Sequence, residues 1–240
     1  IEVPAASLVT MATTYLPFVV DLGLLDYLIG HDEFDYVTSP EVRARIEAGQ
    51  MTEVGSGAGV SVETMIDLEP SLILTSGSGL AEYDAHPALI AAGLPVVLTG
   101  DWLETTPLGR AEWVKFVALF YNAEEKADEI FGDIVENYQA LTDLAASAQE
   151  RPTVFVDAPW QGTWYMAGGG SYTAHLLADA GAEYLWADDE STGSIALDFE
   201  TVLERAADAD FWVNAGGYWF TKDDMLATDE RFAEFAAVQN

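Results

Sequence analysis

The chain has 240 residues, enough for one large domain or two small ones, and half of them are hydrophobic, enough to form cores. Its 41 acidic and 9 basic residues give a formal charge of −32, and it contains no cysteine. The charge excludes nucleic-acid binding, because no basic patch exists to neutralise phosphates, and the missing cysteine excludes disulfides and thiolate chemistry. Such an acidic surface is typical of a protein adapted to high salt, where repulsion between carboxylates is screened.

The first half of the chain alternates short apolar strands with helices. Apolar runs bounded by turn residues predict the strands, and amphipathic spacing with capping residues predicts the helices. The turn at 54–59 is rich in glycine, but the glycine spacing does not fit a dinucleotide-binding loop. The predicted strands are 8–11, 72–75 and 95–98, and the predicted helices are 16–29, a short one from Ser39-Pro40, 61–68, 84–93 and one from Pro107.

One long helix is predicted in the middle of the chain. Between Asn122 and Ala148 apolar residues recur at steps of three and four, which gives a continuous apolar face. Asn122 is the predicted N-cap, with Glu125 completing a capping box, and Pro152 disfavours helical geometry beyond about Gln149. The helix would span roughly 40 Å. A helix of that length between two α/β segments favours a connector between lobes over a core helix.

The second half repeats the alternation of strands and helices. Strands are predicted at 153–156, 184–186 and 211–213, and helices at 171–180, 199–206 and 232–238. This order predicts parallel sheets with crossover helices in each half. The predicted fold class is therefore α/β, with two Rossmann-like lobes joined by one long α-helix. The predicted divisions are 1–121 for the first lobe, 122–149 for the helix and 150–240 for the second lobe.

Aromatic residues follow the predicted strands in both halves. Ligands of open parallel sheets bind outside the carboxyl ends of the strands, so these residues are candidates for ligand contact. Facing lobes would form an aromatic-walled cleft for a sizeable, partly planar ligand, whereas the alternative for each ring is packing inside its own lobe. Trp113 and Trp212 stand at positions typical of a core. The predicted ligand-binding residues are Thr14, Tyr15, Trp102, Glu104, Arg110, Trp160, Trp164, Tyr165, Trp186, Tyr218 and Trp219.

Two features near these residues leave alternatives open. Arg110 could bind an anionic ligand or pair with Glu104 or Glu112. The glycines at 168–170 precede a helix, so their amides could hold an anion, or they could serve only the geometry of the turn. The three histidines are scattered without metal-ligand spacing, and no Gly-x-Ser-x-Gly elbow occurs. We therefore predict no catalytic residue, no metal site and no resident cofactor.

The segment from Val54-Gly55 through 61–74 resembles a hallmark of cobalamin- and ferric-siderophore-binding proteins, the extracytoplasmic receptors of ATP-binding-cassette importers. Stretches at 104–113, 169–182 and 197–203 agree with the same family, so the resemblance covers nearly the whole chain. It implies two Rossmann-like lobes on one long helix, with ligand held between them. It also implies a glutamate on each lobe that docks onto arginines of the permease, here Glu63 and Glu200.

Two departures from the family pattern stand out. Ser71 replaces a frequent aspartate, and the chain stops at Asn240 where relatives continue, so we expect part of the second lobe to lie outside this sequence. The sequence begins at Ile1 and contains no leader, yet the resemblance implies an exported protein at the cell surface or in the periplasm, with a lipid anchor left open.

The expected function is capture of an iron-siderophore, heme or cobalamin-type chelate and its delivery to the permease of the importer, by a monomer without enzymatic activity. A receptor for bare zinc or manganese on the same architecture is the first alternative, and the scarcity of histidine disfavours it. An α/β enzyme is the second alternative, and the missing phosphate loop disfavours it.

Overall fold

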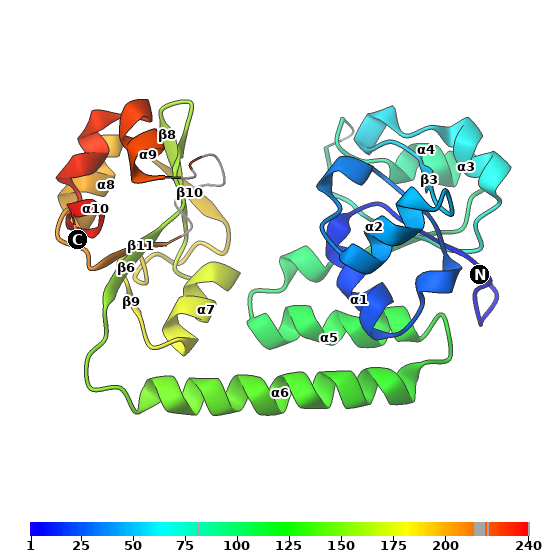
Figure 1. Ribbon diagram of the computed structural model, residues 1–240, viewed down its shortest axis with the longest axis horizontal. Helices are drawn as coiled ribbons and strands as arrows, with labels where there is room; N and C mark the ends of the chain where they lie inside the picture. Colours follow the sequence, from blue (N-terminus) through cyan, green and yellow to red (C-terminus); the bar gives the residue numbers. More distant parts are fainter. Residues whose placement is uncertain (81, 214–218, 220, 240) are drawn as a thin grey trace. The chain divides into compact units, whose positions relative to one another are not determined.

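The computed structural model describes residues 1–80, 82–213, 219 and 221–239 (Figure 1). It divides into two compact units. Unit 1 comprises Ile1–Leu103 and Ala111–Ile134, and unit 2 comprises Glu104–Arg110 and Val135–Asn240. No helix among the described residues combines the length and the apolar character that a membrane span requires.

Unit 1 is built on a five-stranded sheet with the order β3-β2-β1-β4-β5, in which all neighbouring strands are parallel. The strand order reverses between β1 and β4, which makes their carboxyl ends a topological switch point. The strands are β1 Leu8–Thr10, β2 Leu28–His31, β3 Thr52–Glu53, β4 Ile73–Ser76 and β5 Val96–Thr99. The helices are α1 Leu16–Asp21, α2 Pro40–Glu47, α3 Val62–Leu68 and α4 His86–Ala91, with α5 Pro107–Ala118 and α6 Glu124–Ala146 following.

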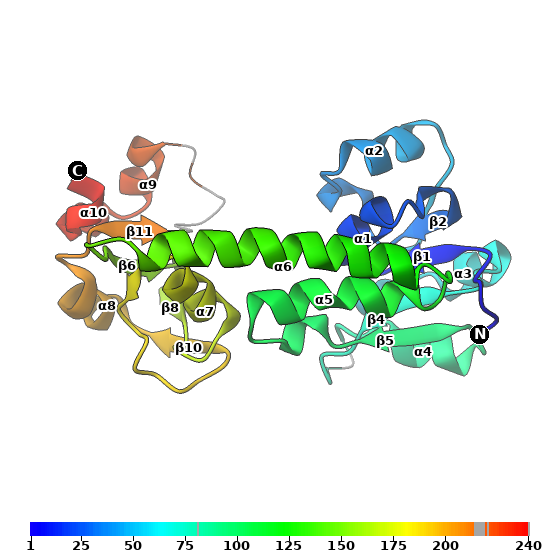
Figure 2. The same ribbon diagram turned by 90° about the horizontal axis from the view of Figure 1, so that it is seen from below.

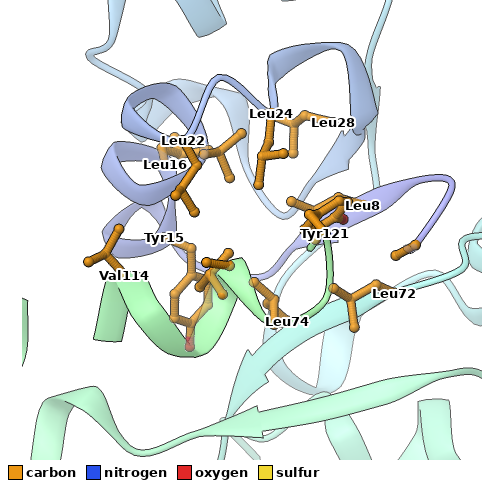
Figure 3. Packing of buried hydrophobic residues seen from close by; sticks show 14 of the residues in the cluster. Leu8, Tyr15, Leu16, Leu22, Leu24, Leu28, Leu72, Leu74, Val114 and Tyr121 are labelled. Atoms are coloured by element: carbon orange, nitrogen blue, oxygen red, sulfur yellow. The ribbon is translucent and has the colours of Figure 1, made fainter. Parts of the chain in front are cut away.

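Apolar side chains cover both faces of this sheet, because successive residues of a strand point to opposite faces. Leu8, Leu72 and Leu74 belong to the larger core, which α1 and α5 complete (Figure 3). Their neighbours Val9 and Ile73 belong to a second core, to which α3 and α4 contribute. A parallel sheet buried on both faces accounts for the continuous apolar runs of its strands.

Two expectations for this part of the chain are wrong. The helix predicted at 16–29 ends at Asp21, because Gly23 adopts a left-handed φ of 74° and the chain then returns as strand β2. Asn122 is not the N-cap of the long helix, since its φ is 52° and the helix begins at Glu124.

The long helix α6 contains 23 residues and is one uninterrupted helix (Figure 2). It passes from unit 1 into unit 2 at Ile134–Val135, which confirms the predicted fold class of two α/β units joined by a long helix. In unit 1 its residue Ala127 is fully buried. In unit 2 the Tyr138 hydroxyl donates a 2.6 Å hydrogen bond to Asp179 Oδ2, which ties α6 to α7 (Tyr172–Asp179).

The described residues of unit 2 form two three-stranded sheets, one of them antiparallel. The parallel sheet has the order β11-β6-β9, and the antiparallel sheet has the order β10-β8-β7. The strands are β6 Thr153–Val156, β7 Pro159–Trp160, β8 Thr163–Ala167, β9 Glu183–Tyr184, β10 Ser194–Leu197 and β11 Phe211–Val213. After α7, the helices are α8 Phe199–Ala206, α9 Lys222–Thr228, a 3-10 helix Glu230–Glu234 and α10 Ala236–Gln239.

The antiparallel sheet and helix α9 are absent from the sequence-based prediction. The hairpin β7–β8 turns at Gln161 and Gly162, which have φ values of 51° and 83°, as a two-residue turn of type I′ requires. The helix predicted at 232–238 is also wrong, because Phe235 is extended and separates the 3-10 helix from α10.

Candidate ligand-binding and docking residues

The carboxyl edge of the unit 1 sheet is held by a buried polar network. The Tyr15 hydroxyl lies 2.7 Å from Thr99 Oγ1, which donates in turn to Asp101 Oδ1 at 2.8 Å. Burial raises the pKa of Tyr15, so the phenol stays neutral and donates. Tyr15 was predicted to contact ligand, but its buried side chain instead joins the turn after β1 to the end of β5. The neighbouring Thr14 is exposed.

His31 is a second buried polar residue at this edge, and the sequence patterns did not single it out. Its side chain is fully buried, with Nδ1 2.8 Å from Thr10 Oγ1 and Nε2 2.9 Å from Asp32 Oδ1. Because Thr10 ends β1 and His31 ends β2, the imidazole fixes the carboxyl ends of two neighbouring strands. The sequence offers one signal for this role, which is a histidine that directly follows a short apolar run.

The hairpin of unit 2 divides its aromatic residues between inside and outside. Side chains alternate along β8, so Trp164 is 0% exposed whereas Tyr165 is 48% exposed. Trp164 Nε1 donates to the Val156 carbonyl at 3.0 Å, and the indole packs among other aromatic rings of the core. Trp160, beside the turn, is 56% exposed. The prediction that Trp164 lines a ligand site is therefore wrong, while Trp160 and Tyr165 lie at the surface.

The other predicted tryptophans also differ in exposure. Trp102 follows β5 in a 3-10 helix at Asp101–Leu103 and is 48% exposed. Trp186 is buried behind Arg205, whose guanidinium carbon lies 5.2 Å from the ring centroid, so the expectation of ligand contact is wrong for it. Trp219 is half-buried, and its Nε1 donates to Thr228 Oγ1 at 2.9 Å. Tyr218 lies outside the described residues.

Trp212 occupies the core position expected of it. It is half-buried in β11, and its ring stacks on Phe155 with centroids 5.1 Å apart. Trp113 is likewise half-buried on α5, with its ring 5.0 Å from that of Phe116.

Arg110 and Glu104 lie in the segment of unit 2 that precedes and begins α5. Arg110 Nε donates to the main-chain oxygen of Glu104 at 3.0 Å, and the guanidinium carbon lies 3.9 Å from the centroid of Tyr172. His175 Nδ1 is 2.7 Å from the Thr105 carbonyl. These contacts order the segment against α7, so Arg110 has a structural role in addition to any contact with an anion.

The glycines at 168–170 serve the geometry of the chain. The amides of Gly168 and Gly170 donate to the carbonyls of Gly193 and Ser191 at 2.8 and 3.0 Å. A Cβ atom on Gly169 would collide with the main-chain oxygen of Asp189, so no other residue fits. Of the two interpretations left open by the sequence, close approach of the 186–193 segment is the one that the structure favours.

The two predicted docking glutamates occupy equivalent positions in the two units. Each lies in the first turn of a short helix, α3 or α8, next to a side-chain N-cap. Ser61 Oγ accepts from the Thr64 amide at 3.2 Å, and Asp198 Oδ1 accepts from the Thr201 amide at 2.7 Å. Glu63 is exposed, and Glu200 is 77% exposed with Oε1 3.2 Å from Arg231 Nη1. A carboxylate in a first turn is also favoured by the helix dipole.

A small surface pocket lies among the described residues of each unit. The pocket of unit 1 has a volume of about 320 Å³ and lies between the start of α1 and the start of α2. The pocket of unit 2 has about 240 Å³, and Phe199, Trp219 and Phe232 are among its lining residues. Trp102, Trp160 and Tyr165 line neither of these pockets. Within the described residues no group of three or more His, Asp or Glu side chains could hold a metal ion.

Residues 8–240 match the family described as periplasmic binding protein. The chain belongs to this family. The resemblance to extracytoplasmic binding proteins is thereby confirmed, and the description of the family is that of a binding protein rather than an enzyme.

The binding protein is similar to relatives of several kinds. An uncharacterized lipoprotein of Methanocaldococcus jannaschii is 29% identical over 254 residues, covering 100% of this chain and 63% of the relative. The chain thus spans less than two thirds of that relative's length. A periplasmic heme-binding protein of Vibrio cholerae aligns with a TM-score of 0.76 at 18% identity, covering 98% of this chain and 86% of the other. The periplasmic vitamin B12-binding protein of Vibrio cholerae aligns with a TM-score of 0.72 at 18% identity, covering 100% of this chain and 86% of the other.

Proposed function

We propose that this binding protein is the extracytoplasmic receptor of an ATP-binding-cassette importer, and that it captures a metal chelate of the heme, corrinoid or ferric-siderophore class. The match of residues 8–240 to the periplasmic binding proteins carries the proposal. The solved structures named for heme and vitamin B12 support this class of ligand. The chelate is cargo, and the receptor itself holds no resident cofactor.

The aromatic side chains at the surface are the residues that we propose to contact the chelate. They are Trp102 in unit 1 and Trp160 with Tyr165 in unit 2, each about half exposed. An indole or phenol ring offers a large rigid face to a macrocycle or an aromatic siderophore, and it loses little conformational entropy on binding. The hairpin supports this role, because Trp164 anchors its inner face and leaves Tyr165 fixed outside.

The remaining predicted polar residues complete this proposal. Thr14 is exposed at the switch point of the unit 1 sheet, and half-buried Glu104 and Arg110 precede the main part of α5. We propose that they supply hydrogen bonds or charge to the polar groups of the chelate. The core residues Tyr15, Trp164 and Trp186 are not part of the proposal, because their side chains are buried.

Docking onto the membrane permease is assigned to Glu63 and Glu200. Both are exposed first-turn glutamates at positions that the family resemblance singles out. The lipoprotein name of the Methanocaldococcus jannaschii relative supports a location outside the cytoplasm with a lipid tether. We propose that the receptor acts there as a monomer.

A spectroscopic titration tests the ligand class. The purified protein is titrated with heme, cyanocobalamin and ferrichrome, and separately with zinc and manganese chloride by calorimetry. One of the three chelates is expected to stay bound through gel filtration, giving a coloured protein peak. If the protein binds zinc or manganese and retains none of the chelates, the proposed function is wrong and the protein is a receptor for the bare metal ion. Binding of neither class would remove the proposed ligand chemistry altogether.

A further inference from the structure

Arg231 lies beside the proposed docking carboxylate of unit 2. Its Nη1 is 3.2 Å from Glu200 Oε1. The same guanidinium makes a two-point contact with Asp229, with Nε 3.0 Å from Oδ1 and Nη2 2.7 Å from Oδ2. Its carbon also lies 4.1 Å from the centroid of the Phe199 ring. One arginine therefore contacts two carboxylates and an aromatic face.

Arg231 is held in place without help from Glu200. Asp229 caps the 3-10 helix Glu230–Glu234 by accepting from the Arg231 amide, and hydrogen bonds from the Arg231 side chain lower the pKa of Asp229. Phe199 is buried in the unit 2 core, so the ring beneath the guanidinium is fixed as well. The positive charge is thus held beside the start of α8 by contacts other than the one with Glu200.

Glu63 in unit 1 stands in a different environment. Across the described residues, the ion pairs within 4.0 Å do not include Glu63. The two helix starts are otherwise alike, with a capping side chain followed two residues later by glutamate. Of the two glutamates, Glu200 is the one that forms an ion pair with a described residue of its own chain.

We propose that Arg231 competes with the permease for Glu200, so that the unit 2 carboxylate docks more weakly than the unit 1 carboxylate. This inference rests on the proposed docking role of the two glutamates. A cationic side chain of the permease must either share Glu200 Oε1 with the Arg231 guanidinium or displace the guanidinium. Sharing is unfavourable because the two positive charges repel at contact distance. Glu63 presents no such competitor among the described residues.

Binding to membrane vesicles tests this competition. Right-side-out vesicles are prepared from cells that encode this receptor, after deletion of its own gene, and are titrated with the fluorescently labelled full chain. Arg231→Gln is expected to tighten binding about two- to fivefold, the range of one exposed ion pair. The gain should disappear when Glu200→Gln is added, and it should shrink as salt is raised. Glu63→Gln should weaken binding more than Glu200→Gln.

Arg205 offers a matched control in the same unit. It also pairs with an exposed aspartate, Asp188, at 2.6 Å and also lies over an aromatic ring, Trp186. Arg205→Gln makes the same change of charge and is expected to leave vesicle binding unchanged. If both variants tighten vesicle binding equally, the change in net charge accounts for the effect, and the proposed competition is overturned.

Two further outcomes separate the inference from the function on which it rests. Weaker binding of Arg231→Gln, with an unchanged unfolding temperature, would mean that Arg231 orients Glu200 for docking, and the competition would be overturned. Unchanged binding of both Glu63→Gln and Glu200→Gln would instead overturn the docking role itself, together with the competition. Tightening that is lost in the Arg231→Gln, Glu200→Gln double variant supports the competition alone.

Discussion

The two units use different side chains to fill their cores. In unit 1 the large core is mainly aliphatic, with Leu8, Leu28, Leu72 and Leu74 fully buried in or beside the strands (Figure 3). In unit 2 the core is an aromatic cluster around Trp164, which has Phe155, Phe199, Trp212, Phe232 and Phe235 as ring neighbours. Both units nevertheless carry the same helix start with its exposed glutamate.

This difference separates two uses of aromatic residues that look alike in the sequence. Trp160, Trp164 and Tyr165 lie within six positions of one another, yet one ring is in the core and two are at the surface. The pleat of the hairpin decides between them. Aromatic content after a strand therefore indicates a binding surface only where the exposure of each ring is known.

The largest expected effect is on the stability of unit 2. Trp164→Ala removes the largest fully buried side chain of the aromatic cluster and is expected to lower the free energy of unfolding by about 3–5 kcal/mol. Denaturant titration followed by circular dichroism measures the loss. Tyr165→Ala, at the next position, is the matched control and should cost less than about 1 kcal/mol. A stable Trp164→Ala protein that loses chelate binding would return Trp164 to the ligand site.

The next effect concerns the proposed ligand contacts in the two units. Trp102→Ala and Trp160→Ala are each expected to weaken chelate binding about tenfold, because each removes a large aromatic contact. Phe211→Ala is a matched control, since Phe211 is 56% exposed, as Trp160 is, but lies on β11 of the parallel sheet, where it pairs with Val154. Absorbance titration of the three variants with the chelate that the wild type retains gives the comparison. If the Phe211 and Trp160 variants lose the same amount of chelate affinity, the proposal that the hairpin contacts the chelate is contradicted.

A smaller effect is expected from the polar network of unit 1. Tyr15→Phe keeps the buried ring but removes the hydroxyl that bonds Thr99, which should cost about 1 kcal/mol of unfolding free energy. Chelate affinity should stay unchanged, because the ring is buried. Thermal unfolding measures the loss of stability, and the absorbance titration measures the chelate affinity. A Tyr15→Phe protein of wild-type stability that binds the chelate more weakly would show that Tyr15 contacts the ligand.

The smallest expected effect distinguishes the two helix caps by their pH dependence. Hydrogen bonds from the Thr201 amide and side chain lower the pKa of Asp198, so its stabilising contribution is present above the unfolded-state pKa and is lost as pH falls through the folded-state pKa. Asp198→Ala should therefore destabilise the protein at neutral pH and make little difference in strong acid. Ser61→Ala should cost about 1 kcal/mol at every pH, because serine does not titrate. Urea midpoints of both variants across pH 2–7 test this, and parallel pH curves would contradict it.

Much of the architecture follows from local sequence patterns alone. The periodicity at 122–149 indicates the long helix, and Ser61 and Asp198 stand at the starts of helices α3 and α8. The parallel strands β1, β4 and β5 of unit 1 and β6 and β11 of unit 2 are short apolar runs that the sequence displays directly. These features depend on residues a few positions apart, so propensity and capping are enough to determine them.

Tertiary structure decided the features that depend on distant partners. The strand β2 looks helical in sequence, and only its pairing with β1 and β3 makes it extended. The hairpin requires β10, about thirty positions away, to complete its sheet. The same reason separates the core rings from the surface rings and brings Arg231 to Glu200, 31 positions distant, because burial and ion pairing are set by what the rest of the chain places against a side chain.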